Sequence, residues 1–241
     1  IDVQELTVWR PLLDHAIEHL SNGKLISTEA DAFWLPDTAG TDYRSRHTKT
    51  SIVLADLDVG ERRLGYFHNA GYFSLQGEDF THVFQLDNRY DPATLPLFAE
   101  LIRVDRVKVL SNGELIDKVH RLIIKSLSRR PLNNPIARFA DRFSNDLPWL
   151  QEGGVDHYHL WAFASIRQLG AAFELGARLL TWLRTHGEPG LEPAIELFAG
   201  IAVKCKTLIL KAARAVNTRR TLDPSDLMMP MAAAWEEGMQ V

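Results

Sequence analysis

Polar side chains of the types used in catalysis are concentrated between Asp31 and Asn69. His47 begins a stretch of alternating, β-branched sequence, and His68 and Asn69 end the next such stretch. Because the strands of an antiparallel pair run in opposite directions, the start of one strand lies near the end of the next. We therefore predict that the side chains of His47 and Asn69 lie within hydrogen-bonding reach of each other.

A histidine whose ring is oriented by a carboxamide is the base of a nucleophilic site. In such a site His47 accepts the proton of a nucleophile, and Asn69 fixes the tautomer of the ring. We expect Asp31, Tyr43 and His68 to line the same cleft and to contact substrate. His68 is also the alternative to Asn69, because a slip of one residue in strand register turns a side chain to the other face. The competing interpretation is that His47 and Asn69 only cap the ends of strands.

Two further sets of reactive side chains are not interpreted as functional sites. His15 and His19 have the spacing of two metal ligands on one helix face, but no third ligand is near, so a solvated helix edge is preferred. Cys205, the only cysteine, lies in the middle of an apolar helical stripe and is predicted to be buried and inert. No cluster of Cys and His has zinc spacing, and no metal or cofactor is predicted.

The elements that position these side chains follow from the periodicity of the sequence. Residues 5–20 have the apolar spacing of an amphipathic helix, and alternation predicts strands at 25–29, 47–58, 64–68 and 72–75, with a hairpin turn at 58–61. From residue 92 the spacing is helical, with helices predicted over residues 95–104, 112–128, 135–143, 155–186 and 191–216, and a last short one after 223. The sequence therefore predicts an α+β fold with two domains, an antiparallel sheet portion over 1–91 and a helical domain over 92–241, divided near Asp91.

Composition limits the class of protein. Of the 241 residues 46% are hydrophobic, enough for a core, and no run approaches the 18 apolar residues of a membrane span. A single cysteine excludes a disulfide within the chain, which favours a reducing cytoplasm. The first residues have neither an initiating Met nor the pattern of a signal peptide, so we expect the sequence to begin inside a longer gene product.

Charge is distributed unevenly along the chain. Residues 1–100 carry 16 acidic and 8 basic side chains, whereas residues 101–241 carry 15 acidic and 19 basic ones. The rear part is too weakly basic, and too poor in interleaved aromatic residues, to predict binding to nucleic acid. We expect Lys204, Lys211 and Arg214, on the solvent side of one helix, to contact an acidic partner. The alternative is an ordinary solvated helix face.

Three segments resemble a bacterial family catalogued as domain of unknown function 1839. They are FWLPDTAGTDYR from Phe33, HTKT from His47 and GYFHNAGY from Gly65, and the resemblance extends from Ile1 to the C-terminus. The order of helix, acidic strand, loop, His-led strand and hairpin ending in a carboxamide more distantly resembles papain-like acyltransferases of the butirosin biosynthesis protein H type. Those enzymes move an aminoacyl unit from a carrier protein to an amine.

The second resemblance implies a papain-like sheet portion and cysteine-dependent acyl transfer or amide hydrolysis. His47 matches the histidine, Asn69 the third residue, and Asp31 an acidic residue that precedes the loop. No cysteine precedes His47, so the nucleophile is expected outside this sequence, and the sequence alone is expected to be inactive. The implied partners are an acidic carrier protein and a small-molecule amine. The alternative is a non-catalytic small-molecule-binding or scaffold protein.

Overall fold

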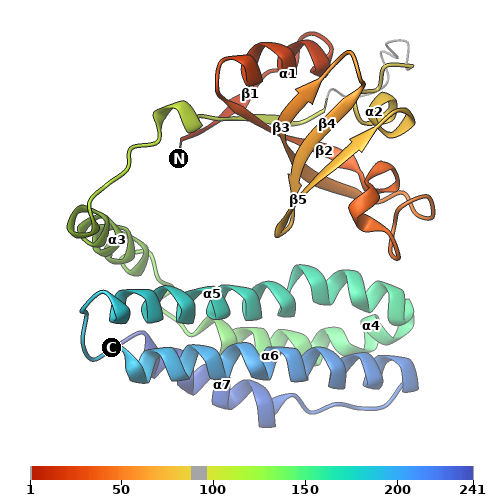
Figure 1. Ribbon diagram of the computed structural model, residues 1–241. Coiled ribbons are helices and arrows are strands. Elements are labelled where there is room, and N and C mark those ends of the chain that lie inside the picture. Colours follow the sequence, from red (N-terminus) through yellow and green to blue (C-terminus); the bar gives the residue numbers. More distant parts are fainter. Residues whose placement is uncertain (1, 88–96, 241) are drawn as a thin grey trace. The chain divides into compact units, whose positions relative to one another are not determined.

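The computed structural model describes residues 2–87 and 97–240, and the chain divides into two compact units, residues 1–109 and 110–241. The first unit contains a sheet with the strand order β1-β6-β2-β3-β4-β5, in which every neighbouring pair is antiparallel (Figure 1). The strands are β1 (Val3–Leu6), β2 (Leu25–Asp31), β3 (Lys49–Asp58), β4 (Arg63–His68), β5 (Gly71–Gln76) and β6 (Ala99–Ile102). Its helices are α1 (Leu12–Ser21) and α2 (Glu78–Val83), with the 3₁₀ turns η1 (Ala32–Trp34), η2 (Pro36–Thr38) and η3 (Val104–Arg106).

The central hairpin forms where apolar and polar residues alternate. On β3 the side chains of Ile52 and Leu54 are buried, while Lys49 and Ser51 are exposed. This period of two places one set of side chains against the core and the other in solvent. β4 returns beside β3 with a register shift between Leu54 and Asp56, so the hairpin bends at that point.

The segment between β2 and β3, residues 32–48, is folded back by local hydrogen bonds. The Thr38 hydroxyl donates to the carbonyl oxygens of Ala32 and Leu35, at 2.8 and 2.9 Å. The Leu35 side chain is fully buried in the core of the sheet unit. These contacts fix both 3₁₀ turns, and with them the chain that leads to His47.

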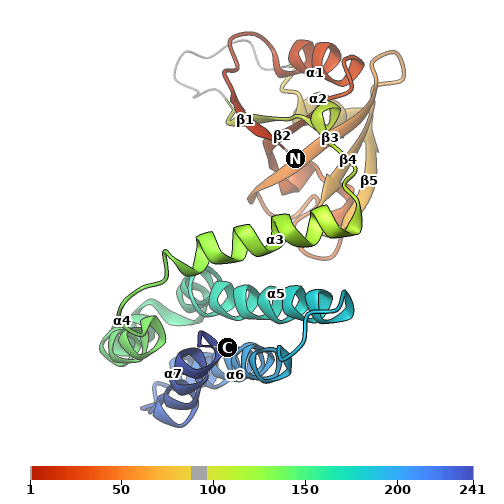
Figure 2. The same ribbon diagram turned by 90° about the vertical axis from the view of Figure 1, so that its left-hand side faces the viewer.

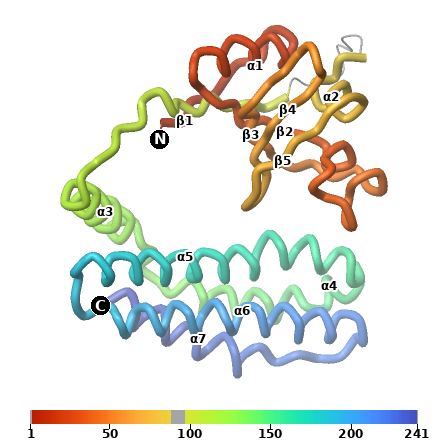
Figure 3. The backbone as a smooth tube through the Cα atoms, in the orientation of Figure 1, coloured from red at the N-terminus to blue at the C-terminus, as the bar shows by residue number. Residues whose placement is uncertain are grey.

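The second unit is helical and consists of α3 (Asn112–Leu127), α4 (Pro135–Ala164), α5 (Ile166–Thr185), α6 (Glu192–Thr218) and α7 (Ser225–Gly238). Helices α4 to α7 lie side by side (Figures 2 and 3) around a core to which Phe143, Ile201 and Leu208 belong. Within α4, Gly154 has φ 78°, in the left-handed region that glycine tolerates, and it interrupts the helix. None of the described helices is long and apolar enough to cross a membrane.

The predicted α+β class is confirmed, but the predicted boundary is not the one observed. The units divide between Val109 and Leu110, whereas the predicted boundary at Asp91 lies outside the described residues. The helix predicted over 95–104 is wrong for its described part, because β6 pairs there with both β1 and β2. A four-residue strand has too little periodicity to be recognised, and its state is decided by its neighbours in space.

Candidate functional site

His47 is paired with Asp31. Its Nδ1 lies 2.6 Å from the Asp31 carboxyl oxygen Oδ2, and because a carboxylate only accepts, the ring donates from Nδ1. The Asp31 oxygen Oδ1 accepts hydrogen bonds from the backbone N–H groups of Phe33 and Thr48, at 3.1 and 3.2 Å. The His47 ring also stacks on Phe33 with 4.4 Å between ring centroids. Asp31 is thus held by the backbone and in turn orients the imidazole.

The pair faces a pocket with a volume of about 420 Å³. Its walls include Glu29, Lys49 and His82 besides the pair itself. Glu29 and Lys49 form an ion pair, and the hydrogen bond from Lys49 lowers the pKa of Glu29. Because 70% of the His47 side chain remains exposed, its Nε2 is accessible to a ligand in this pocket.

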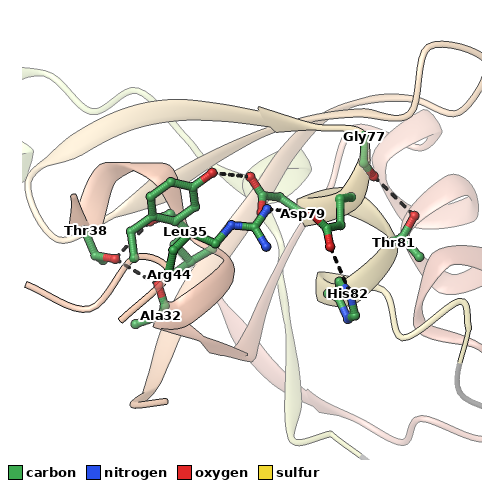
Figure 4. Close-up of polar contacts among 10 residues, drawn as sticks. Ala32, Leu35, Thr38, Arg44, Gly77, Asp79, Thr81 and His82 are labelled. Carbon is green, nitrogen blue, oxygen red and sulfur yellow. Dashed lines mark hydrogen bonds and ion pairs between the residues drawn. The ribbon is translucent and has the colours of Figure 1, made fainter. Parts of the chain in front are cut away.

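Trp34 forms another wall, and its ring contacts both His82 and Arg44. The imidazole of His82 stacks on one face with 3.6 Å between centroids, and the Arg44 guanidinium lies 4.3 Å from the ring centroid. Arg44 also reaches the buried Asp79 of α2 at 2.6 Å (Figure 4). The Tyr43 hydroxyl donates to the other oxygen of Asp79, at 3.0 Å. These contacts fasten the segment 32–48 to α2.

A second His–Asp pair lies in the interior of the sheet unit. His68 Nδ1 is 2.6 Å from Asp37 Oδ2, and the Tyr66 hydroxyl donates to Asp37 Oδ1 at 2.5 Å. The other ring nitrogen, Nε2, lies 3.0 Å from the Thr50 hydroxyl oxygen and 3.3 Å from Asn69 Nδ2. Burial and the hydrogen bond to Asp37 raise the pKa of Tyr66.

Comparison with family models covers nearly the whole chain. The model of the DUF1839 N-terminal domain matches residues 1–104, and that of the DUF1839 C-terminal domain matches residues 112–241. The chain belongs to the DUF1839 family. The stretch between the two matches contains the division observed between Val109 and Leu110, so each DUF1839 domain corresponds to one compact unit. No curated protein matches the chain.

The DUF1839 N-terminal domain does not form the predicted contact between His47 and Asn69. Among the contacts of the described residues His47 bonds to Asp31, and Asn69 lies against His68. The reason is register: Val53 opposes Phe67, which places Asn69 level with Ser51, four residues beyond His47. Asp31, expected only to line the cleft, is the residue that orients His47.

The other two predicted site residues do not contact His47. His68 belongs to the interior group, and Tyr43 bonds to Asp79 on α2 instead of facing His47. Asp37 is a functional candidate that sequence reasoning missed. Its only signal is its place beside a proline in a loop, because the contacts to Tyr66 and His68 depend on how that loop folds over β4.

The expectation of a solvated edge is wrong for His15. This residue is only 2% exposed, and neither ring nitrogen has a hydrogen-bond partner among the described residues. Burial lowers the pKa of His15, and Arg10 and His19 lower it further. The Trp9 ring covers His15 edge-on at 5.8 Å, which is why a position on the border of the helical stripe is enclosed.

In the DUF1839 C-terminal domain the predicted burial of Cys205 is confirmed. Its side chain is 1% exposed, and burial raises the pKa of the thiol to about 11. Nearby on α6, Lys211 and Arg214 are exposed and Lys204 is half-buried. The acidic partner expected at these three residues stays a prediction.

Proposed function

We propose that the DUF1839 N-terminal domain contains a papain-like acyl-transfer or amide-hydrolysis site in which His47 is the general base and Asp31 orients it. The observation that carries this proposal is the 2.6 Å contact from Nδ1 to Asp31, which leaves Nε2 at an open pocket. A base held by a carboxylate, with its second nitrogen free, is the arrangement that activates a nucleophile. Asp31 takes the orienting role assigned to Asn69 by sequence.

The proposed nucleophile is a cysteine thiol that residues 1–241 do not supply. Cys205 is unsuitable, because its side chain is buried and burial raises the pKa of its thiol, which keeps it protonated. In the proposed step His47 Nε2 takes the thiol proton, and the sulfur attacks the carbonyl carbon of a thioester or amide. The leaving group receives the proton from His47. An amine or water then attacks the acyl-enzyme and restores the thiol.

The proposed substrates follow from charge. Residues 1–100 carry 16 acidic and 8 basic side chains, an excess of negative charge that suits an amine-bearing acceptor. An acidic carrier protein is the proposed acyl donor, docked against the exposed Lys211 and Arg214 of α6. The single cysteine agrees with a reducing, cytoplasmic setting.

The test compares the complete gene product with two variants in an assay for acyl transfer from a thioester to an amine. His47→Gln removes the base, and we expect kcat/KM to fall by about 100- to 10,000-fold. Asp31→Asn should lower it less and shift the pH profile, because the amide no longer fixes the protonated Nδ1. A His47→Gln variant that keeps its fold and retains activity within about threefold of the parent would overturn the proposal.

A matched control comes from Arg63, a half-buried residue that pairs with the exposed Asp56 on the neighbouring strand. Arg63→Gln removes one charged group from the same unit without touching the pocket. We expect unchanged kcat/KM for this variant. Mass spectrometry of the trapped acyl-enzyme identifies the residue that carries the acyl group.

The second candidate is a non-catalytic ligand-binding protein. It is favoured by the two hydrogen bonds that Asp31 accepts from backbone N–H groups. Such bonds hold a loop in place in a binding protein as well as in an enzyme. In that case His47→Gln lowers the affinity for a small-molecule ligand, and no acyl-enzyme is trapped from the parent protein.

A further inference from the structure

The interior group of the sheet unit has the order of a nucleophile, a base and an orienting acid. His68 donates from Nδ1 to Asp37 at 2.6 Å, because a carboxylate only accepts. In its neutral form the ring then carries no proton on Nε2. The Thr50 hydroxyl oxygen lies 3.0 Å from that nitrogen, so its O–H donates to the lone pair.

We propose that Thr50 is the nucleophile of a second acyl-transfer site, with His68 as its base and Asp37 as the residue that orients His68. The site is independent of the function proposed for His47, since it uses a hydroxyl from this chain and a different His–Asp pair. A nucleophile bonded to a base, with the base oriented by a third group, is the general pattern of activated hydroxyl nucleophiles.

The elements hold the three groups rigidly. Thr50 is on β3 and His68 is the last residue of the neighbouring strand β4. Thr50 points to the same face of the sheet as the buried Ile52, two residues along the strand. Asp37 is fixed over that face by the 2.5 Å bond from Tyr66.

Burial separates the base from bulk water. The side chains of His68 and Asp37 are 5% and 4% exposed, and Tyr66 is fully buried. Hydrogen bonds in such surroundings are stronger than in water and need no reorganisation when charge develops. The Asp37 contact therefore stabilises the imidazolium that forms when His68 takes the Thr50 proton.

The group lies nearest to solvent at Thr50 and Asn69. Thr50 is half-buried and Asn69 is exposed, and Asn69 Nδ2 lies 3.3 Å from the ring nitrogen that faces Thr50. The Asn69 amide and the Thr50 hydroxyl are thus alternative donors to the same lone pair of Nε2, and the Thr50 oxygen is the nearer of the two. Asn69 has φ 50°, a left-handed value that Asn commonly adopts in the turn between two antiparallel strands. Because Thr50 is half-buried, the proposed substrate carries a short acyl group on an activated ester or thioester.

The reaction conserves atoms and charge without a cofactor. The Thr50 proton moves to His68 Nε2 as the hydroxyl oxygen bonds to the acyl carbonyl carbon. The tetrahedral intermediate expels the alcohol or thiol, which takes the proton from His68, and Thr50 is left as an ester. A water molecule, deprotonated by His68, then hydrolyses that ester and restores the hydroxyl.

The probe is p-nitrophenyl acetate, added to the whole chain, with release of p-nitrophenol followed and the acetylated residue located by peptide mass spectrometry. We expect acetyl-Thr50 in parent protein that is quenched with acid during turnover, before water hydrolyses the ester. Thr50→Val, which removes the hydroxyl with little change of shape, should abolish that adduct. His68→Gln should slow its formation by about 100-fold or more.

The matched control is Thr28→Val on the neighbouring strand β2. Thr28 is also buried, but its hydroxyl bonds to the Phe98 carbonyl oxygen at 3.2 Å and not to a histidine, so acetylation of Thr50 should be unchanged. If His68→Gln does not fold, Asp37→Asn replaces it and should slow acetylation while circular dichroism stays native. Absence of acetyl-Thr50 from the folded parent, or a rate indifferent to the His68 or Asp37 change, overturns the proposal.

Discussion

The sheet unit buries polar side chains, whereas the described part of the helical unit has an apolar interior. The buried polar or charged residues are His15, Thr28, His68, Asp79 and Thr81, and all belong to residues 1–109. The core cluster of the helical unit is formed by aliphatic and aromatic side chains with Met and Cys. Buried polar networks fix geometry at a cost in desolvation, while apolar cores supply stability. The difference favours the first unit as the location of the proposed chemistry.

Substitution of Asp37 should have the largest effect on stability, and it tests the difference between the two units. Asp37→Ala leaves Tyr66 and His68 buried without their acceptor, and we expect the free energy of unfolding of the sheet unit to fall by about 3–5 kcal/mol. Denaturant titration monitored by amide signals of each unit measures this. Asp56→Ala, which breaks the exposed pair with Arg63, should cost less than about 1 kcal/mol. Equal effects of the two changes would contradict the contrast.

Truncation of a buried leucine tests the apolar core of the helical unit. Leu208 is fully buried in the helical core, and Leu208→Ala should lower the free energy of unfolding by about 2–5 kcal/mol through lost burial and a cavity. The loss of stability should appear in the amide signals of helices α4 to α7. Both proposed acylation activities should persist at temperatures where the variant remains folded. An activity lost in proportion to helical stability would show that the second unit takes part in the chemistry.

Cys205 gives a smaller effect in the same core. Its Sγ lies 3.7 Å from Met231 Sδ, and Cys205→Ala should lower the free energy of unfolding by about 1–2 kcal/mol. A thiol reagent should modify the native parent protein only as fast as the helical unit opens. Immediate labelling under native conditions would refute its burial.

The lowered pKa of His15 predicts that the free energy of unfolding of the sheet unit depends modestly on pH. Burial lowers its folded pKa, so below the unfolded value of about 6.5 the unfolded state binds more protons than the folded state. Stability should therefore be unaffected above that pH and should fall as pH decreases from about 6.5 through the lowered pKa. His15→Leu should reduce this slope in denaturant titrations between pH 8 and 5. The prediction is wrong if the free energy of unfolding changes with pH to the same extent in the parent protein and in the His15→Leu variant.

Sequence predicted those parts of the fold that depend on local pattern. The hairpin was placed at 47–58 and 64–68 and is observed at Lys49–Asp58 and Arg63–His68, because alternation is a property of neighbouring residues. β1 and β6 were not predicted, because Val3 pairs with Ile102 and neither four-residue strand is decided locally.

The site shows the same limit. His47 and Asp31 were both selected by residue type, but which partner orients His47 depends on strand register and could not be read from spacing. Likewise the group of Thr50, Asp37 and His68 joins residues 18 and 31 positions apart, and only the folded segment 32–48 brings Asp37 over the sheet.

The position of β6 between β1 and β2 has a consequence for synthesis on the ribosome. Val3 leaves the ribosome early, yet its strand partner Ile102 is translated 99 residues later. At about 5–20 residues per second this interval is about 5–20 s. From the time β2 is translated until Ala99–Ile102 follow, the backbone N–H and C=O groups of β2 that later pair with β6 remain an open sheet edge, the kind of edge on which nascent chains associate. Slow codons just before residue 99 would lengthen the exposure, and rapid ones would shorten it.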